Sequence, residues 1–198
     1  MKLLVALSCL ALTSFACSTP TRRVDPDKDD TIGGTGIDSA DVRTMADKMA
    51  RSLLDTPEIF KNGTPRVVVK DLTNNTRFHI DRSLLIRKLR TELQQNARGK
   101  IQFLAREDME AVLKEREAKR SGAVGTTTSE AGEPKLGNVA GADYFLTGTI
   151  AGIAKTSGSD ASDYINVEFR MVDAETTALV WSQDYDVKKV GESGVLDR

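Results

Sequence analysis

The chain has 198 residues, of which 39% are hydrophobic, 29% charged and 5% aromatic, and this composition is that of an ordinary globular protein. A formal net charge of -1 gives no electrostatic basis for binding nucleic acid. The length suits one domain with an export signal and a tether, and it is short for two complete hydrophobic cores.

The cysteine and histidine content restricts the chemistry that the chain can perform. Both cysteines, Cys9 and Cys17, lie within the first 17 residues, so neither can close a disulfide inside the body of the chain. His79 is the only histidine, and one imidazole is too few for the usual zinc sites. The sequence therefore predicts neither a metal nor a cofactor.

Residues 1–16 have the features of a signal peptide. A short positive start, Met1 and Lys2, precedes an apolar run from Leu3 to Phe15. This run of about 13 residues is shorter than the ~20 that a helix needs to cross a bilayer. We therefore expect a cleaved segment and not a permanent membrane helix.

Cleavage is expected after Ala16, directly before Cys17. A cysteine after a small residue resembles the lipobox of bacterial lipoproteins, which implies attachment of lipid, such as palmitate, at Cys17. Ser14 and Phe15 depart from the lipobox, and Ser14 with Ala16 also fits ordinary secretory cleavage. A free secreted protein is therefore the alternative. Ser18 after the cysteine points, by the same resemblance, to the periplasmic face of the outer membrane.

Residues 17–38 are predicted to be the lipidated cysteine and a flexible tether. The segment after the cysteine is rich in Pro, Thr, Asp, Lys and Gly, with Val24, Ile32 and Ile37 as its larger apolar residues. A tether of about 21 residues spans at most ~75 Å when fully stretched and roughly 25 Å as a flexible coil. The folded domain is expected over residues 39–198.

Two helices are predicted early in the domain. Asp38 or Ser39 is expected to cap the first helix, and Asp81 precedes the second, which ends near Gly99. Apolar residues recur at helical spacing on one face of each helix. These residues are Val42, Met45, Ala46, Met49 and Leu53 in the first helix, and Leu85, Leu89 and Leu93 in the second.

Two short strands and a third helix are predicted next. The strands are the β-branched run 66–70 and residues 101–104. Residues 106–120 are expected to form the helix, with acidic residues early and basic residues late, an order that complements the helix dipole. Its buried stripe is predicted to be Met109, Val112 and Leu113. A loop over residues 121–134 and a short helical turn within 136–140 follow.

Three strands are predicted to finish the chain, over residues 144–154, 164–172 and 179–187. The middle strand alternates cleanly between apolar and polar residues, and its apolar residues are Ile165, Val167, Phe169 and Met171. A tight hairpin at 173–177 makes the last two strands antiparallel. Trp181, between strand residues, is expected to belong to the core.

The predicted order of elements is α-β-α-β-α-β-β-β. Helical crossovers make the first strands parallel, and hairpins make the last ones antiparallel. We therefore expect a single α/β domain in which three to four helices pack against a mixed sheet of about four to five strands.

Four stretches carry a resemblance to a known family. They are VVVKDLTNNT (67–76), FLAREDM (103–109), GADYFL (141–146), and the hairpin segment 167–181 that ends in LVW. In this order they resemble the outer-membrane lipoproteins of the LpoB type, which activate a bifunctional penicillin-binding protein.

The resemblance implies a binding protein without catalysis of its own, acting in peptidoglycan synthesis, cell wall biogenesis and cell shape. Such proteins dock on a regulatory domain of the synthase from a flexible tether. The tether here is shorter and poorer in proline than in the best-known members. The strand-and-loop pattern also resembles the lipoproteins of outer-membrane secretion and assembly related to curli export, so a subunit of such a complex is the alternative.

The sequence predicts no catalytic residue. No G-x-S-x-G elbow is present, and after cleavage no Cys-His pair. Gly33 to Gly36 lacks the preceding strand and following lysine of a phosphate loop, so it is interpreted as linker. Because a glycan hydrolase needs only one or two carboxylates, a cell-wall hydrolase is the third hypothesis. No partner-binding residue can be named from the sequence.

Overall fold

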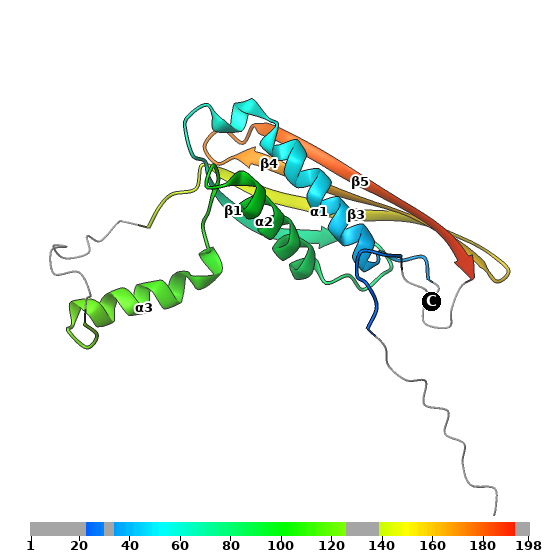
Figure 1. Cartoon of the computed structure of the whole chain (residues 1–198), viewed down its shortest axis with the longest axis horizontal. Helices are drawn as coiled ribbons and strands as arrows, with labels where there is room; N and C mark the ends of the chain where they lie inside the picture. Colours follow the sequence, from blue (N-terminus) through cyan, green and yellow to red (C-terminus); the bar gives the residue numbers. More distant parts are fainter. Residues whose placement is uncertain (1–22, 30–33, 126–138, 193–198) are drawn as a thin grey trace, which may run out of the picture.

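The computed structural model describes residues 23–29, 34–125 and 139–192, and its elements follow the predicted order (Figure 1). The helices are α1 (Ser39–Leu54), α2 (Arg82–Ala97) and α3 (Met109–Arg120), with short 3₁₀ helices η1 (Pro57–Phe60) and η2 (Arg106–Asp108). The strands are β1 (Arg66–Asn74), β2 (Gln102–Phe103), β3 (Tyr144–Ser157), β4 (Asp160–Asp173) and β5 (Leu179–Glu192).

The strands form one sheet in the order β2-β1-β3-β4-β5. β1 pairs in parallel with β2 and with β3, whereas β4 pairs antiparallel with β3 and with β5. Each parallel connection along the chain passes through a helix, and each antiparallel one is a hairpin. The predicted single α/β domain with a mixed sheet is confirmed.

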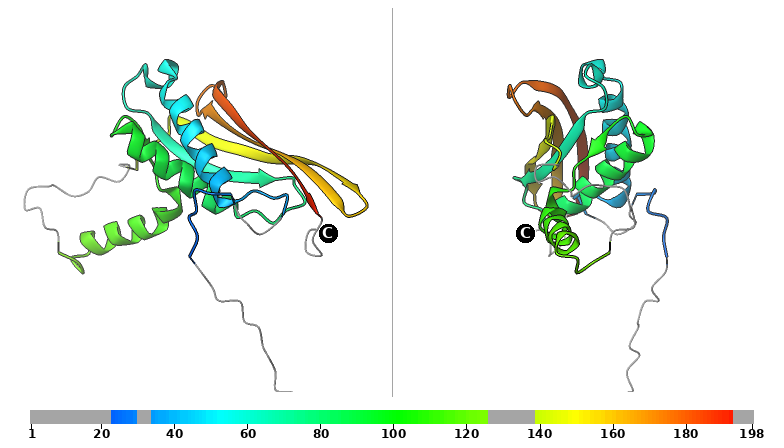
Figure 2. Two further views of the ribbon diagram at one scale, coloured as in Figure 1. Left: turned by 45° about the vertical axis from the view of Figure 1, so that its right-hand side comes forward. Right: turned by 90° about the vertical axis from the view of Figure 1, so that its left-hand side faces the viewer.

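α1 and α2 lie side by side on one face of this sheet (Figure 2). Asp38 caps α1: its carboxylate accepts the backbone N–H of Asp41 at 2.9 Å, and the Asp41 carboxylate accepts that of Asp38 at 3.1 Å. Asp81 caps α2 by accepting the N–H groups of Ser83 and Leu84. Both predicted helix starts are confirmed.

The core lies between these two helices and the sheet. The predicted apolar faces of α1 and α2 and the predicted inner face of β4 are all buried. Trp181 is 7% exposed, and its indole N–H donates to the Ser52 hydroxyl of α1 at 3.1 Å. The prediction that Trp181 belongs to the core is confirmed.

The last three strands are longer than the sequence indicates. β3 continues to Ser157, β4 begins at Asp160, and β5 runs to Glu192. Residues 155–163 are almost all polar and lack the alternation that marks a strand. Here the strands are specified by backbone pairing, which continues in register to Ser157 and Asp160 around Gly158, whose φ is +61°.

The predicted buried stripe of α3 is wrong. No residue of α3 is buried, and Val112 and Leu113 are 48% and 50% exposed. The apolar spacing specifies which face of a helix is hydrophobic, but it does not supply the surface that covers it. α3 points away from the layer formed by α1 and α2 (Figure 1). The expected helical turn at 136–140 falls largely outside the described residues.

At Gly148 of β3 the packing leaves no room for a side chain. A Cβ at this position would collide with the backbone carbonyl of Glu168 and approach the Leu72 side chain to 2.8 Å. Gly148→Ala should therefore lower the free energy of unfolding by about 1–3 kcal/mol, measured by urea denaturation. Gly141→Ala, where a Cβ meets nothing within 4 Å, should change it by less than about 0.5 kcal/mol. Equal effects of the two variants would contradict this packing.

Candidate docking surfaces

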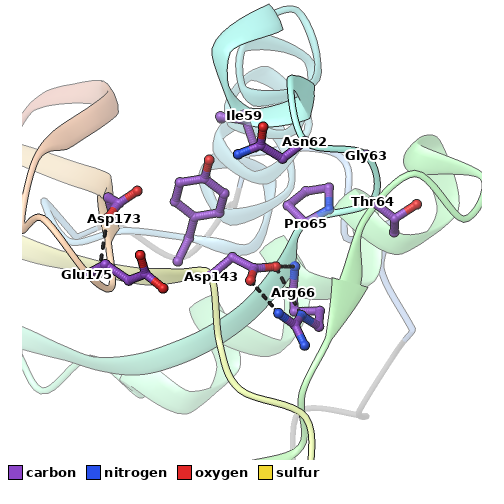
Figure 3. A pocket seen from close by; sticks show the side chains of 10 residues that line it. Ile59, Asn62, Gly63, Thr64, Pro65, Arg66, Asp143, Asp173 and Glu175 are labelled. Atoms are coloured by element: carbon purple, nitrogen blue, oxygen red, sulfur yellow. Dashed lines mark hydrogen bonds and ion pairs between the residues drawn. The ribbon is translucent and has the colours of Figure 1, made fainter.

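A polar cavity with a volume of about 450 Å³ lies at the end of the sheet where β1 and β3 begin (Figure 3). It is lined by η1, the turn before β1, the starts of β1 and β3, and the turn between β4 and β5. Its charged residues are Arg66, Asp143, Asp173 and Glu175. Three carboxylates and one guanidinium make the cavity acidic.

Arg66 and Asp143 join the starts of β1 and β3. The Asp143 carboxylate accepts three hydrogen bonds from Arg66: from the backbone N–H at 2.8 Å, from Nε at 3.1 Å and from Nη2 at 2.6 Å. Figure 3 shows the two side chains facing each other. These hydrogen bonds hold the pKa of Asp143 below its ordinary value. The pair therefore fixes two parallel strand starts.

Asp173 is committed to the turn that follows it. Its carboxylate accepts the backbone N–H groups of Glu175 at 2.9 Å and Thr176 at 2.7 Å, and also the Thr176 hydroxyl. Hydrogen bonds to Thr176 lower the pKa of Asp173. Asp143 and Asp173 thus both lack the raised pKa that the general acid of a glycosidase requires.

The end of the predicted tether is part of the folded domain. Thr35 is 1% exposed, and its hydroxyl donates to the carboxylate of Asp163 on β4. Arg77 donates to the same carboxylate from Nε at 3.0 Å and from Nη2 at 2.6 Å. We call Thr35, Arg77 and Asp163 the Asp163 cluster. Gly36 packs beside the Phe78 ring, where a Cβ would lie 3.4 Å from it.

A second polar contact connects the segment before α1, and the first turn of α1, to β5. Lys189 donates to the carboxylates of Asp38 at 2.8 Å and Asp41 at 2.7 Å. Burial lowers the pKa of Lys189, but the two carboxylates outweigh burial and raise it. The expectation of a flexible tether up to residue 38 is therefore wrong for residues 34–38. The packed domain therefore begins at least four residues before the predicted boundary. Thr35 hydrogen-bonds Asp163 near the start of β4, and Asp38 hydrogen-bonds Lys189 near the end of β5.

Sequence reasoning missed the Asp163 cluster, although one signal was present. Asp163 continues the inward-facing positions of β4, two residues before Ile165. A carboxylate on the buried side of a strand requires a partner. The pattern shows that a partner exists, but only the fold shows that it consists of Arg77 and Thr35.

The other candidate residues have simpler outcomes. Cys17 and Ala16 lie outside the described residues, so lipid attachment and cleavage stay predictions. His79 is exposed in the loop before α2. Within residues 23–29, 34–125 and 139–192, no group of three or more His, Cys, Asp or Glu side chains is arranged to hold a metal. Of the helices in the described part of the chain, none has the length and apolar content to cross a membrane.

The family model of the peptidoglycan-synthase activator LpoB matches residues 41–187. The chain belongs to the LpoB family. The matched segment runs from the first turn of α1 into β5 and includes the polar cavity, Asp163 and α3, while Thr35 precedes it. Members of the LpoB family act as activators of peptidoglycan synthesis.

The solved structures to which the chain is similar include two LpoB domains. The C-terminal domain of LpoB from Salmonella enterica is 17% identical, with a TM-score of 0.45, over 75% of this chain and 99% of that one. The same domain from Escherichia coli is 16% identical, with a TM-score of 0.44 and the same coverage. A lipoprotein from Neisseria meningitidis is 18% identical, with a TM-score of 0.35, over 66% and 88% of the two chains. No curated protein matches.

The Asp163 cluster should make stability depend on pH in a defined direction. Burial raises the pKa of Asp163, but the hydrogen bonds from Arg77 and Thr35 outweigh it and lower the pKa. A lowered folded-state pKa gives stability that is present above about pH 4, the unfolded value, and that is lost as the pH falls through the folded one. Asp163→Asn should lower the free energy of unfolding by about 1–3 kcal/mol at pH 7. The difference in this free energy between wild type and variant should be smaller at pH 3.

Urea denaturation at pH 7 and pH 3 measures this difference in the free energy of unfolding. Asp160→Asn is the matched control, because Asp160 lies on the same strand and is exposed. It should change the free energy of unfolding by less than about 0.5 kcal/mol. A difference for Asp163→Asn that stays constant from pH 7 to pH 3 would show that the charge of Asp163 does not stabilise the fold.

Proposed function

We propose that the protein is a lipid-anchored lipoprotein of the outer membrane whose periplasmic domain binds and activates a bifunctional penicillin-binding protein. The match of the activator family to residues 41–187, nearly the whole described domain, carries this proposal. The export signal expected at residues 1–16 and the cysteine at position 17 support the anchor.

Activation in this proposal is linkage between binding and conformation. A protein that binds the active conformation of a synthase more tightly than the inactive one shifts the population toward activity. The size of the shift is limited by the difference between the two affinities. In this proposal the domain catalyses no reaction, because docking alone shifts the population of the synthase.

The anchor restricts where the domain can act. Lipid chains at Cys17 would hold the protein at the membrane effectively permanently, since each buried methylene contributes about 0.8 kcal/mol. Because Thr35 is buried in the domain, the segment after Cys17 spans at most ~60 Å when fully stretched. The Ser39 hydroxyl also donates to the Pro26 carbonyl at 2.9 Å, and Arg43 pairs with Asp27. These contacts shorten the reach of the tether further. In this proposal the synthase therefore extends toward the outer membrane to meet the domain.

Activation can be tested with purified components. The full-length protein should raise the rate of glycan polymerisation by a detergent-solubilised bifunctional synthase from the same cell several-fold, because docking stabilises the active conformation. The readout is consumption of labelled lipid precursor. Cys17→Ala is the matched control: it should activate equally in detergent, since its domain is intact, but fail in cells. An unchanged rate with the wild-type protein, or release of muropeptides from purified sacculi by the protein alone, would contradict the proposal.

The anchor has its own test. In cells fed labelled palmitate, the wild-type chain should carry label and sediment with the outer membrane, and Cys17→Ala should carry none and appear in the soluble fraction. Cys9→Ala removes a cysteine that lies eight residues earlier, inside the predicted signal, and should keep the label. Unlabelled wild-type protein would support the alternative of a free secreted form.

A further inference from the structure

β5 is a long strand at the edge of the sheet. It has 14 residues and pairs with β4 on one side, whereas β2 at the opposite edge has two residues. Among the described residues no strand pairs with the other side of β5. Figure 1 shows no described helix beyond the outer edge of the second half of β5. An edge strand presents a row of backbone N–H and C=O groups with which another strand can pair.

β5 lacks the backbone features that protect an edge strand from pairing. It contains no proline, and its pairing with β4 is regular from Trp181 onward, without a bulge. Lysine side chains are a further protection, and Lys189 is already held by the carboxylates of Asp38 and Asp41. Lys188 is exposed and forms no salt bridge within the part of the chain that the structure describes. Lys188 is therefore the charge that a pairing strand has to neutralise.

Asp186 supplies a carboxylate on the same outward face of β5, two residues before Lys188. Tyr164 donates to its Oδ1 at 2.6 Å and Asn166 at 2.8 Å. These hydrogen bonds, from Asn166 and then Tyr164, lower the pKa of Asp186. Over the described ranges Asp186 has no cation as a partner. It is thus a charged, exposed carboxylate whose second oxygen is available.

The order Asp186-Val187-Lys188 is complementary to itself when two copies of β5 run antiparallel. A two-fold axis through Val187, perpendicular to the sheet, places Asp186 of each copy directly opposite Lys188 of the other. Side chains opposite each other on antiparallel strands have Cβ atoms about 4.5–5.5 Å apart, so opposite charges there stabilise the pairing. An axis moved by one residue would set Asp186 against Asp186 or Lys188 against Lys188, which is destabilising. The charges therefore specify one register.

We propose that two copies of this chain pair edge to edge through β5, antiparallel about a two-fold axis at Val187, to form one ten-stranded sheet. Residues 183–191 of the two strands then oppose each other with roughly ten backbone hydrogen bonds. The axis keeps α1 and α2 of both copies on the same face of the joined sheet, and the contact closes on itself. A strand pair about 30 Å long buries less than the ~800 Å² per partner of a stable complex, so the dimer is weak and reversible.

Disulfide capture in cells tests this register without requiring a stable dimer. Two differently tagged full-length copies are co-expressed, one carrying Asp184→Cys and the other Val190→Cys. Both positions are exposed, and they lie opposite each other in the proposed pairing, at the Cα separation of about 5 Å that suits a disulfide. The yield of disulfide-linked heterodimer should be at least tenfold above that of copies without added cysteine.

Ile153→Cys in place of Val190→Cys is the matched control. Ile153 is 60% exposed and lies on the same face of the sheet, but it belongs to β3, away from the β5 edge. An equal yield with Ile153→Cys overturns the proposal. So does a yield no higher than that of copies without added cysteine, which is the result expected if another segment of the chain covers the β5 edge.

Charge exchange supplies a readout that misfolding cannot imitate. Asp186→Lys in both copies should lower the heterodimer yield at least fivefold, because lysines then oppose lysines. Asp186→Lys in one copy with Lys188→Asp in the other should restore the yield, because both opposed pairs again carry opposite charges. A yield that stays unchanged in the first combination, or that is not restored in the second, overturns the proposal. None of these results depends on whether the protein activates a synthase.

Discussion

Burial of one face of the sheet beneath α1 and α2 is the constraint on which the other features depend. Phe169 and Met171 on β4 meet the apolar stripes of the two helices, and all of these side chains are almost fully buried. Each such side chain contributes roughly 1.5–3 kcal/mol when removed from water, so this layer sets the register of the sheet. With the inner face of β4 fixed inward, the alternation along the strand leaves Asn166 and Glu168 outward.

The same layer places distinct polar sites at opposite ends of the molecule. β1 begins at the Arg66–Asp143 pair beside the polar cavity and ends near the loop that carries Arg77. The N-terminal segment joins the domain at the Arg77 end, through Asp163 and Lys189. In the proposed function this end faces the outer membrane, because the tether joins the domain there. The cavity end then lies farther from the membrane, on the side where a synthase approaches.

Local patterns predicted most elements correctly and misjudged several segments for physical reasons. The caps at Asp38 and Asp81 and the alternation of β4 depend on neighbouring residues, so the sequence predicts them. The far half of the β3–β4 hairpin is polar and is held by backbone pairing, which has no side-chain signature. Residues 34–38 have the composition of a linker, yet Thr35 is buried because Asp163, more than a hundred residues later, needs a donor. Within the polar cavity, GADYFL marked Asp143 as part of a family motif without indicating Arg66 as its partner.

The sequence by itself determined the order of helices and strands, the mixed sheet, the membership suggested by four short stretches, and the hydrophobic face of every helix. These properties follow from the spacing of apolar residues and from caps and turns, which act over a few positions. Only the tertiary structure decided which hydrophobic faces are covered, because covering depends on surfaces brought together from distant parts of the chain. For that reason the apolar faces of α1 and α2 are buried as predicted, while α3, with a shorter apolar stripe, remains exposed.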